Sequence, residues 1–544
     1  MKHIHYIYTL LFGVAVLLFF GLAYPHHLHY QEQFQLFLFD STYVWDIITL
    51  PGGISDLLGR FSTQFFLYAW VGALIIAVLL SLIQLLTLHQ FNAPLSRRTL
   101  ATKGTQECST LRSAAGRLLP KGRKNGQWSM VNGQWSMVNG QWSYGLTFVP
   151  SCLLWLFLLD ENALLGGVWA LLLTLLAACL FSHFSDGWRR RILLIAATPV
   201  LYWMVGPVCV VFFLLQAPNP KRSVWYYGVF VILAIMLVIL ALYLPVPANS
   251  LWFGIHYYRY PADIPVLLWS ASLSVFILTL AARIMNRWTS SKSIVAALCS
   301  FALVAVGMGG FVWDNSNFKA EKVMRYDFMA RHQQWNRILE TINIEKPNNQ
   351  IGVTVQNLGL AMHGMLTKHL FDYNQNGIAG LLPDFGTDAI SPLPTSEAFY
   401  QLGMITVAQR MVFEAQEAIL DFQKSGRCYK RLAQTNLILG NYEVARKYLT
   451  ALQKTLFYRE WANETLPLLG DEKAIAKHPE YGRLRQMTYK DDFYFGGHVT
   501  PDMLENLLAS NAGNRLAYEY LVAYYMLTGD REGYANLLRK MNQQ

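Results

Sequence analysis

Long apolar runs, separated by short polar segments, dominate the first 313 residues of the chain. A helix of about 20 apolar residues is long enough to cross the hydrocarbon core of a bilayer. Six runs have roughly this length, and a shorter one, Leu146–Leu159, is a further candidate. The six are Ile4–Tyr24, Phe65–Leu88, Leu164–Phe184, Val224–Leu244, Pro265–Ile284 and Ile294–Trp313. The pattern predicts an all-α bundle of membrane helices over residues 1–313.

The first run has the position of a signal peptide but lacks its other features. It is long and ends in the bulky Tyr24, which Pro25 and His26 follow, and it has no small-residue cleavage site. We therefore expect this run to remain in the protein as a membrane helix.

A further apolar stretch, Ile192–Leu215, allows two interpretations. It contains Pro199 and Gly206-Pro207. Basic residues flank it, Arg189–Arg191 before and Lys221-Arg222 after. A single span would leave one basic group outside, whereas a hairpin broken at Gly206-Pro207 keeps both groups inside. We prefer the hairpin, and with it counted as two the bundle has about nine spans.

From about Phe318 the chain changes to the amphipathic pattern of soluble helices. Leu432–Leu449 predicts two helices joined by a turn at Gly440, and Ala517–Leu538 repeats this plan. Such helix pairs are the units of tetratricopeptide repeats (TPRs), so residues 314–544 are expected to form an irregular TPR-like α-solenoid. Solenoids of this kind bind peptides or partner proteins.

The composition agrees with a membrane protein. Hydrophobic residues make up 53% of the 544 residues and charged residues only 14%, whereas soluble domains carry about a quarter charged residues. These values exclude a disordered chain, a disulfide scaffold and a simple soluble enzyme. The net charge of +10 by itself suggests a nucleic-acid partner, so the position of the charges decides its meaning.

The charge excess lies entirely in the first 313 residues, which hold nineteen basic and nine acidic residues. If the N-terminus is cytoplasmic, seventeen of the nineteen lie on the cytoplasmic side, eight of them in the loop 91–146. Only Arg60 and Arg259 remain outside. The charge thus indicates orientation in a bacterial inner membrane, with residues 314–544 in the periplasm. We expect no nucleic-acid partner.

Two further features add no chemistry. Only one of the six cysteines, Cys428, lies in the C-terminal domain, so no disulfide can form within that domain. No paired ligand spacing indicates a metal, and no cofactor is indicated.

A tandem repeat at 125–145, built on Asn-Gly-Gln-Trp-Ser, favours turns over a coiled coil. We interpret the repeat as a duplication without a function.

Candidate chemistry on the outer side begins with the first outer loop, residues 25–64. Apolar residues in this loop lie close to Glu32 and Asp40, and Arg60 follows an aspartate at i, i+4 spacing. Such an amphipathic segment is expected to lie along the membrane surface as short helices. The carboxylate of Glu32 or Asp40 is a candidate base that takes a proton from an acceptor hydroxyl.

The second outer loop, residues 245–265, adds His256, Tyr257 and Arg259. A guanidinium presents a planar fork of donors that suits phosphate. Arg259, together with Arg60, is therefore a candidate for binding a phosphate-linked substrate, and His256 and Tyr257 would line the same site.

Each of these residues also has a purely structural interpretation. Arg60 can pair with the aspartate four residues before it, Asp40 can cap a helix, and Glu32 can be solvated. Tyr257 fits an aromatic belt at the lipid interface, and Arg259 fits a contact with lipid headgroups. Both kinds of interpretation stay open from the sequence.

The plan resembles two groups of membrane proteins. Glu32 and Asp40 after the first span, the long outer loop to Phe66 and the helical tail resemble GT-C membrane glycosyltransferases, some of which end in TPRs. This resemblance implies sugar transfer from a lipid-linked donor, with Glu32 or Asp40 as the base. The chain is also similar to an uncharacterised family of bacterial envelope membrane proteins in three segments: Tyr30–Phe39, Pro51–Phe66 and Gln409–Leu456.

Two functions follow as hypotheses. The first is a GT-C-type glycosyltransferase at the outer face, whose helical tail binds a protein acceptor. It requires that Glu32 or Asp40 and Arg259 line one outward-facing cavity. The second is a non-catalytic anchor, embedded among membrane lipids, that presents the helical tail as a scaffold for envelope assembly. A transporter is disfavoured, because no predicted span has a charged residue at mid-membrane.

Overall fold

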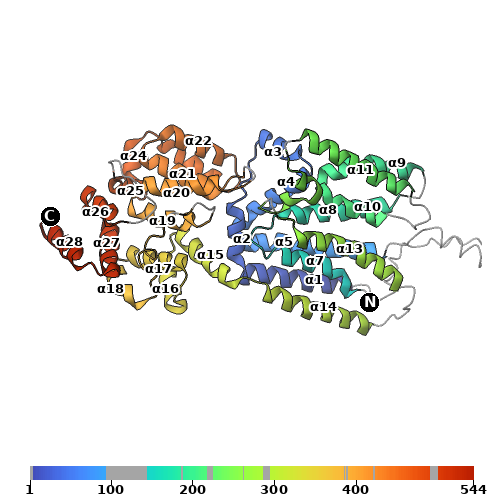
Figure 1. The fold of residues 1–544 in the computed structure, drawn as a ribbon, viewed down its shortest axis with the longest axis horizontal. Coiled ribbons are helices and arrows are strands. Elements are labelled where there is room, and N and C mark those ends of the chain that lie inside the picture. Colours follow the sequence, from blue (N-terminus) through green and yellow to red (C-terminus); the bar gives the residue numbers. More distant parts are fainter. Residues whose placement is uncertain are drawn as a thin grey trace, which may run out of the picture.

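The computed structural model describes residues 4–92, 144–184, 188–216, 224–244, 246–260, 263–285, 294–384, 386, 390–420, 423–489 and 500–543. Helices form about four-fifths of this part of the chain, and no strand longer than an isolated bridge occurs in it. Two helical halves lie end to end, the predicted membrane bundle and the C-terminal half (Figure 1). The tandem repeat at 125–145 lies outside the described residues.

Every predicted apolar run forms a helix. The helices are α1 (Ile4–Leu18), α5 (Ala69–Asn92), α7 (Val149–Phe157), α8 (Leu165–Ser182), α9 (Trp188–Val205), α10 (Val210–Gln216), α11 (Val224–Tyr243), α13 (Val266–Met285) and α14 (Ile294–Asp314). A helix satisfies its backbone hydrogen bonds internally, which a lipid environment demands. A π-helical turn, Phe19–Ala23, extends α1.

Four helical stretches of the described chain are long and apolar enough to cross a membrane by length and composition: Tyr6–Ala23, Ala69–Phe91, Leu165–Ser182 and Trp188–Gln216, the last of which contains a break described below. A fifth is possible if α14 and α15 (Phe318–Arg331), bent by 58°, form one span. Because α15 contains six charged residues, we place the membrane boundary at the end of α14. A membrane protein is confirmed, and the count of nine spans stays a prediction.

The stretch from α9 to α10 folds back on itself. Gly206, at φ +58°, begins the break between the two helices. The side chain of Arg190, at the start of α9, donates to Gln216 Oε1, at the end of α10, over 2.7 Å. A continuous helix would hold these two residues about 39 Å apart. The predicted hairpin at Gly206-Pro207 is therefore present in the structure.

Three short helices follow α1 at the end of the bundle nearest the C-terminal half: α2 (Pro25–Gln33), α3 (Ser41–Ile48) and α4 (Gly53–Thr63). Helix α4 crosses α8 at very close range. A Cβ atom on Gly59 would lie 2.4 Å from the backbone nitrogen of Gly166. Small residues allow such contacts between membrane helices, so the glycine at 59 fixes the position of α4.

The C-terminal half is a succession of short antiparallel helices. After α15 come α16 (Trp335–Glu345), α17 (Gln350–Met362), α18 (Leu366–His369), α19 (Pro392–Leu402), α20 (Ile405–Glu417), α21 (Gly426–Leu439), α22 (Tyr442–Gln453), α23 (Arg459–Thr465), α24 (Glu472–Lys477), α25 (Tyr481–Met487), α26 (Pro501–Ser510), α27 (Arg515–Thr528) and α28 (Arg531–Gln543). The two predicted helix pairs are α21–α22 and α27–α28. Each turns at a glycine with positive φ, Gly440 and Gly529.

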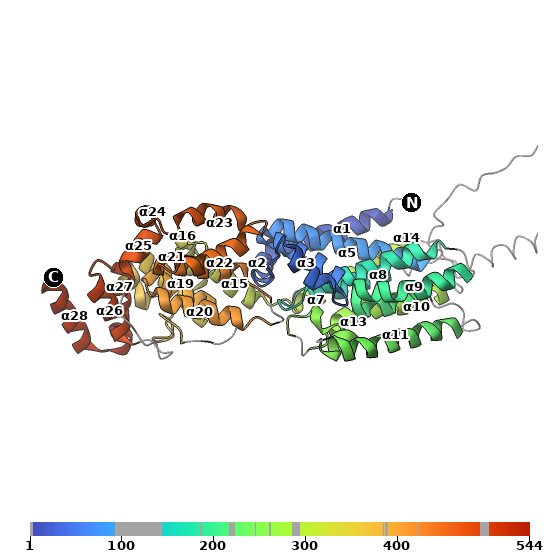
Figure 2. The ribbon, with the colours of Figure 1, turned by 90° about the horizontal axis from the view of Figure 1, so that it is seen from above.

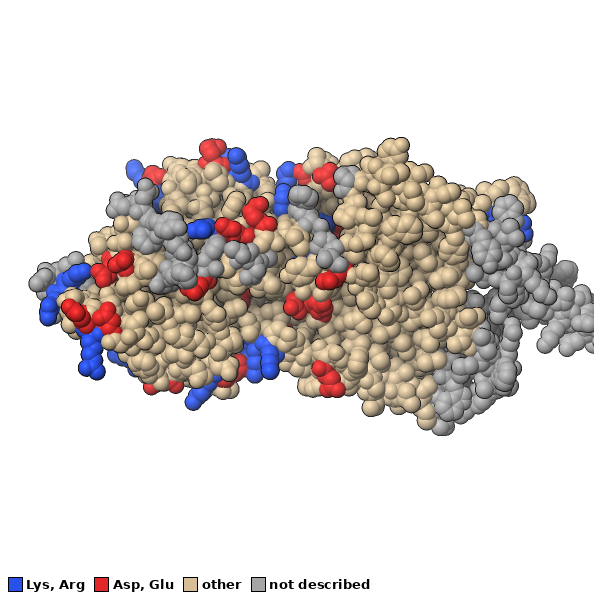
Figure 3. Space-filling view, viewed as in Figure 1, with Lys and Arg blue, Asp and Glu red and all other residues tan. Residues whose placement is uncertain are grey.

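Charged side chains are distributed as the sequence predicts. On the face shown in Figure 3 they cover the C-terminal half and the junction, and the bundle surface is almost free of them. Seen from above, the bundle and the C-terminal half remain in line, and α2 lies between them (Figure 2). The helix that carries Glu32 thus lies at the junction of the two halves.

Candidate functional site

Helix α2 begins at a carboxylate from the C-terminal half. The backbone N–H groups of His26 and His27 donate to the two carboxylate oxygens of Glu321, on α15, over 2.8 and 2.9 Å. Pro25 occupies the first helical turn, where its missing N–H costs nothing. An anion at a helix N-terminus is stabilised by the helix dipole. Glu321 therefore joins the bundle to the C-terminal half through the backbone of α2.

The polar end of α2 points into the C-terminal half. Tyr458 donates its hydroxyl to Glu32 Oε1 over 3.0 Å, and Arg331 lies 3.8 Å from Glu32 Oε2. Gln33 accepts from Arg427 over 3.2 Å. Glu32 is only 5% exposed, so it is not solvated. Burial raises the pKa of Glu32, and the charge of Arg331 and the Tyr458 hydroxyl only partly oppose this rise.

Helix α21 supplies a buried ion network that the sequence did not single out. Arg427 donates to both carboxylate oxygens of Asp327, over 2.6 and 2.9 Å. Glu397, 2% exposed, pairs with Arg427 at 3.4 Å and also with Arg431. Arg431 in turn lies 3.6 Å above the ring of Tyr400. The network links α15, α19 and α21 directly beneath α2.

The i, i+4 spacing of Arg427 and Arg431 places both on one face of a helix. That spacing was the one sequence feature that could have indicated the network. Their acidic partners lie 100 and 34 positions away, so no local pattern identifies them.

Arg259 lies against another face of α2. Its guanidinium carbon is 4.4 Å from the ring centre of Phe34 and 5.5 Å from that of Tyr30. Its Nη1 contacts Asn162 Oδ1 at 3.5 Å, and its backbone N–H donates to Asn162 O over 2.8 Å. The side chain is 6% exposed, and its Nε and Nη2 make no hydrogen bond. Burial lowers the pKa of this guanidinium.

A buried cation of this kind is energetically costly. Taking one ion out of water costs several kcal/mol, on the order of 3–5 when its partner is missing. Each cation–π contact returns only about 0.5–2 kcal/mol. No carboxylate of the described chain lies within ion-pair distance of Arg259. Arg259 is thus the least compensated charge among the predicted site residues.

Arg60, His256 and Tyr257 form a separate group around α4. Arg60 pairs with Asp56 at 2.8 Å, which confirms the helical ion pair. The Tyr257 hydroxyl lies 2.8 Å from Ser55 Oγ and donates to Val205 O over 3.0 Å. Since Tyr257 is fully buried, its interpretation as part of a lipid-facing aromatic belt is wrong.

His256 contacts Tyr257 at a tilt of 50°, with 4.0 Å between the ring centres, and lies near Gly52. Burial lowers the pKa of His256 to about 4, so the ring is neutral at pH 7. Its Nε2 is buried without a hydrogen bond. The group around α4 is therefore largely a packed hydrogen-bonded cluster.

Asp40 caps a helix, as its structural interpretation predicts. It accepts from the backbone N–H of Thr42, the second residue of α3, over 2.9 Å. It also pairs with Lys454 of the C-terminal half. The hydrogen bond from Lys454, followed by those from Thr42, lowers the pKa of Asp40. Asp40 is ionised at neutral pH and contributes to the contact between the two halves.

The six predicted site residues therefore occupy three places. Glu32 and Asp40 contact the C-terminal half, Arg259 lies against the Tyr30 face of α2, and the other three surround α4. In the described part of the chain neither carboxylate contacts Arg259. The catalytic roles of Glu32 and Asp40 stay predictions.

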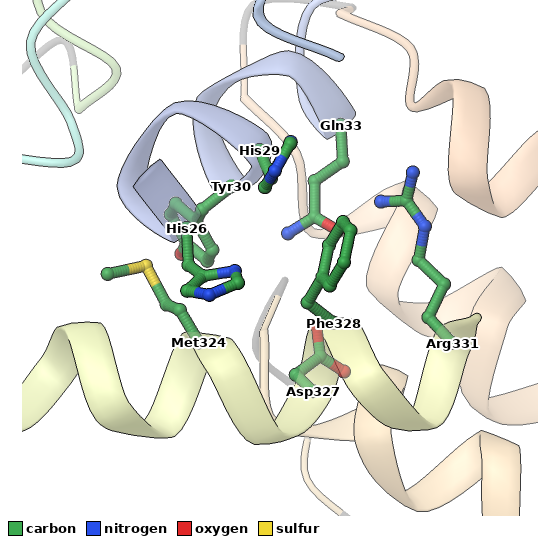
Figure 4. A pocket seen from close by; sticks show the side chains of 8 residues that line it. All are labelled: His26, His29, Tyr30, Gln33, Met324, Asp327, Phe328 and Arg331. Atoms are coloured by element: carbon green, nitrogen blue, oxygen red, sulfur yellow. The ribbon is translucent and has the colours of Figure 1, made fainter. Parts of the chain in front are cut away.

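A small hollow of about 10 Å³, room for roughly one water molecule, lies between α2 and α15 (Figure 4). Its wall is polar and aromatic, with His26, His29, Tyr30 and Gln33 on one side and Met324, Asp327, Phe328 and Arg331 on the other. Phe328 stacks on His29, with 4.4 Å between the ring centres. No group of three or more metal-ligating side chains occurs among the residues that the structure describes.

The Glu321 cap predicts a pH dependence. Burial raises the pKa of Glu321 from 4.5 to about 7, against the lowering effect of the two N–H groups. A carboxyl whose pKa is raised by folding contributes stability that is fully present below about pH 4.5 and is lost as the pH rises through about 7. We expect a loss on the order of 3 kcal/mol across this window. The Glu321→Gln variant should not show this pH-dependent loss of stability.

Hydrogen exchange of α2 at pH 5 and pH 7.5 would measure this effect. The buried histidines of α2 act in the opposite direction below pH 6.5, because burial lowers their pKa values. The informative quantity is therefore the difference between wild type and Glu321→Gln. Glu443→Gln, at a residue whose side chain is 84% exposed, is the control and should behave as wild type. Equal pH dependence in all three proteins would refute the effect.

The long apolar helices of the bundle define the class of the chain as a membrane protein. The chain belongs to a family of unknown function, DUF6057, whose model matches residues 1–544. Comparisons with curated proteins and with solved structures gave no match.

Proposed function

We propose that the protein is a non-catalytic membrane anchor that holds a TPR-like domain in a fixed orientation as a scaffold for envelope assembly. The domain lies in the periplasm of a bacterial cell, and the bundle of about nine spans lies in the inner membrane with the N-terminus in the cytoplasm. The observation that supports this proposal most is the seam of hydrogen bonds and apolar contacts between residues 24–40 and the C-terminal half.

Backbone hydrogen bonds tie the seam along its length. Leu36 N–H donates to Lys424 O over 2.9 Å, and Phe39 N–H donates to Lys454 O over 2.6 Å. Apolar contacts accompany them, since Leu36 packs with Leu449 and Ala462 in one buried cluster. Backbone pairing with the bundle would hold the C-terminal half in one orientation. A scaffold needs such a fixed orientation, because it must present its binding surface at a set height and angle above the membrane.

The orientation follows from the charges of the bundle. Helix α9 lies in the part of the bundle that is remote from the C-terminal half (Figure 1), and Arg189 and Arg190 belong to its first turn. Basic residues mark the cytoplasmic side. The C-terminal half is therefore assigned to the periplasm, where its helix pairs are available to a protein partner.

A GT-C-type glycosyltransferase is the second candidate function. Its support is the state of Glu32, a buried carboxyl with a raised pKa whose Oε2 has no hydrogen bond. Carboxyl groups in such environments often serve in proton transfer. In this alternative Glu32 takes a proton from the acceptor, and the donor is a lipid-linked sugar or oligosaccharide.

Two variants distinguish the candidates. Glu32→Gln keeps an oxygen that can accept from Tyr458 but cannot act as a base. Leu36→Pro removes the N–H that donates to Lys424 and leaves every candidate catalytic group unchanged. We expect a strain lacking the gene to keep normal surface and protein-linked glycans but to show a leaky envelope. Glu32→Gln should restore the barrier, and Leu36→Pro should fail although it reaches the membrane.

The measurements are envelope permeability to a large dye and the glycan profile, with the membrane level of each variant determined by immunoblot. Loss of glycan in the deletion strain, with no rescue by Glu32→Gln, would overturn the scaffold in favour of the transferase.

A further inference from the structure

Three buried side chains gather at α2, His27, Tyr30 and Arg259, and each has polar atoms without a well-formed hydrogen bond. They are 1%, 7% and 6% exposed. Both ring nitrogens of His27, the hydroxyl of Tyr30, and Nε and Nη2 of Arg259 lack a partner in good hydrogen-bond geometry. Tyr30 and Arg259 lie close to one another, and His27 lies close to the backbone of Leu158, but these contacts are not well aligned. His27 and Tyr30 are three residues apart on one helix and so share a face. Buried polar atoms are nearly always paired, so this group requires an explanation.

Arg259 is held in place from one side only. Asn162 contacts Nη1, and the Phe34 ring lies beneath the guanidinium plane. The remaining edge, Nε and Nη2, presents two parallel N–H groups. This is the edge that binds a phosphate or carboxylate through two hydrogen bonds. No acidic side chain of the described chain occupies it, although Glu161 lies near enough to influence the Arg259 charge.

Tyr30 separates Arg259 from open space. Its ring lines the hollow of Figure 4, and its ring centre is 5.5 Å from the Arg259 guanidinium carbon. Arg331 and Asp327 both line the same hollow, and Arg331 also lies 3.8 Å from Glu32 Oε2.

Apolar surface begins directly beyond Arg259. Tyr260, Ile264 and Val266 are 39%, 46% and 67% exposed, and α13 starts at Val266. The cluster therefore lies at the level where a membrane helix begins, which is the level of lipid headgroups.

We propose that Arg259, Tyr30 and His27 form a binding site for a phosphate group. Nε and Nη2 of Arg259 donate to two phosphate oxygens, the Tyr30 hydroxyl donates to a third, and His27 donates through one ring nitrogen. A membrane lipid headgroup and free phosphate share this chemistry. The site depends on neither the scaffold nor the transferase, because it is assigned from unpaired buried donors alone.

The test uses the purified full-length protein in a non-ionic detergent, stripped of lipid. One arm adds phosphatidate, one adds diacylglycerol, which lacks the phosphate, and one adds inorganic phosphate. Native mass spectrometry and the melting temperature report binding. We expect phosphatidate, and not diacylglycerol, to bind and to raise the melting temperature. A rise with inorganic phosphate alone would assign the site to free phosphate and would equally support it.

The variants test the residues. Arg259→Gln should weaken binding at least tenfold, and Arg259→Lys should also weaken it because an ammonium lacks the planar fork. Tyr30→Phe should weaken binding several-fold while the fold, judged by its elution profile, stays unchanged. Arg446→Gln, at a half-exposed residue of α22, is the matched control and should bind as wild type. Absence of binding in every arm, or equal binding by Arg259→Gln and wild type, would overturn the proposal.

Discussion

Replacing Glu397 with glutamine is expected to destabilise the C-terminal half by about 3–5 kcal/mol. Glu397 is the only carboxylate within ion-pair distance of Arg431 in the described chain, and it also pairs with Arg427. Burial alone would raise the pKa of Glu397, but Arg431 and Arg427 outweigh this effect and lower it. The glutamine would leave Arg431 buried without a counter-ion.

Hydrogen exchange of α19 and α21 in the full-length protein measures this loss. A change of about 3 kcal/mol accelerates exchange through opening by more than a hundredfold. The control is Glu414→Gln, because Glu414 is 40% exposed and lies 4.0 Å from Arg410. An exposed pair of this kind contributes at most about 1 kcal/mol.

A double variant separates charge from packing. Arg431→Met in the Glu397→Gln background removes the unpaired cation and should recover much of the lost stability. If the double variant is no more stable than Glu397→Gln alone, the unpaired charge of Arg431 is not the cause of the loss.

Replacing Gly59 with alanine is expected to destabilise the bundle by at least 2 kcal/mol. The added Cβ would lie 2.4 Å from Gly166 N and 2.6 Å from Gly166 Cα. Both atoms belong to the backbone of α8, so no flexible side chain can move away. Helix α4 must therefore separate from α8, and the contacts of Asp56 and Ser55 with their partners would be strained as well.

Two other glycines provide a matched series. On Gly166 the nearest atom to a new Cβ is 3.3 Å away, and on Gly228 no atom lies within 4 Å. We expect Gly166→Ala to cost less than Gly59→Ala, and Gly228→Ala, in a helix, to be neutral or slightly stabilising. The melting temperatures of the detergent-solubilised proteins, followed by size-exclusion chromatography, rank the three variants by stability. Equal melting temperatures for Gly59→Ala and Gly228→Ala would show that the two helices are not held by this contact.

The extent to which the site could be predicted differs from residue to residue. The ion pair of Arg60 and the helix cap of Asp40 depend on neighbours within four positions, and both structural interpretations are confirmed. The partner of Glu32, Tyr458, is 426 positions away. The sequence therefore allowed a solvated Glu32 and a catalytic Glu32 equally, and gave no reason to expect a buried one.

The amino-acid sequence by itself determined the helices of the bundle and the asymmetry of charge, and it favoured the hairpin at Gly206-Pro207 without deciding it. Each depends on local composition, because a helix in lipid satisfies its hydrogen bonds within about four residues. Only the tertiary structure decided which charges are buried and which are paired. Arg259 and Arg427 are both arginines next to aromatic or apolar residues in sequence, yet one has a carboxylate in contact and the other has none. That difference arises from contacts between segments that are distant in sequence. As a result, the charge of Arg259 lies beside α2 without a carboxylate partner.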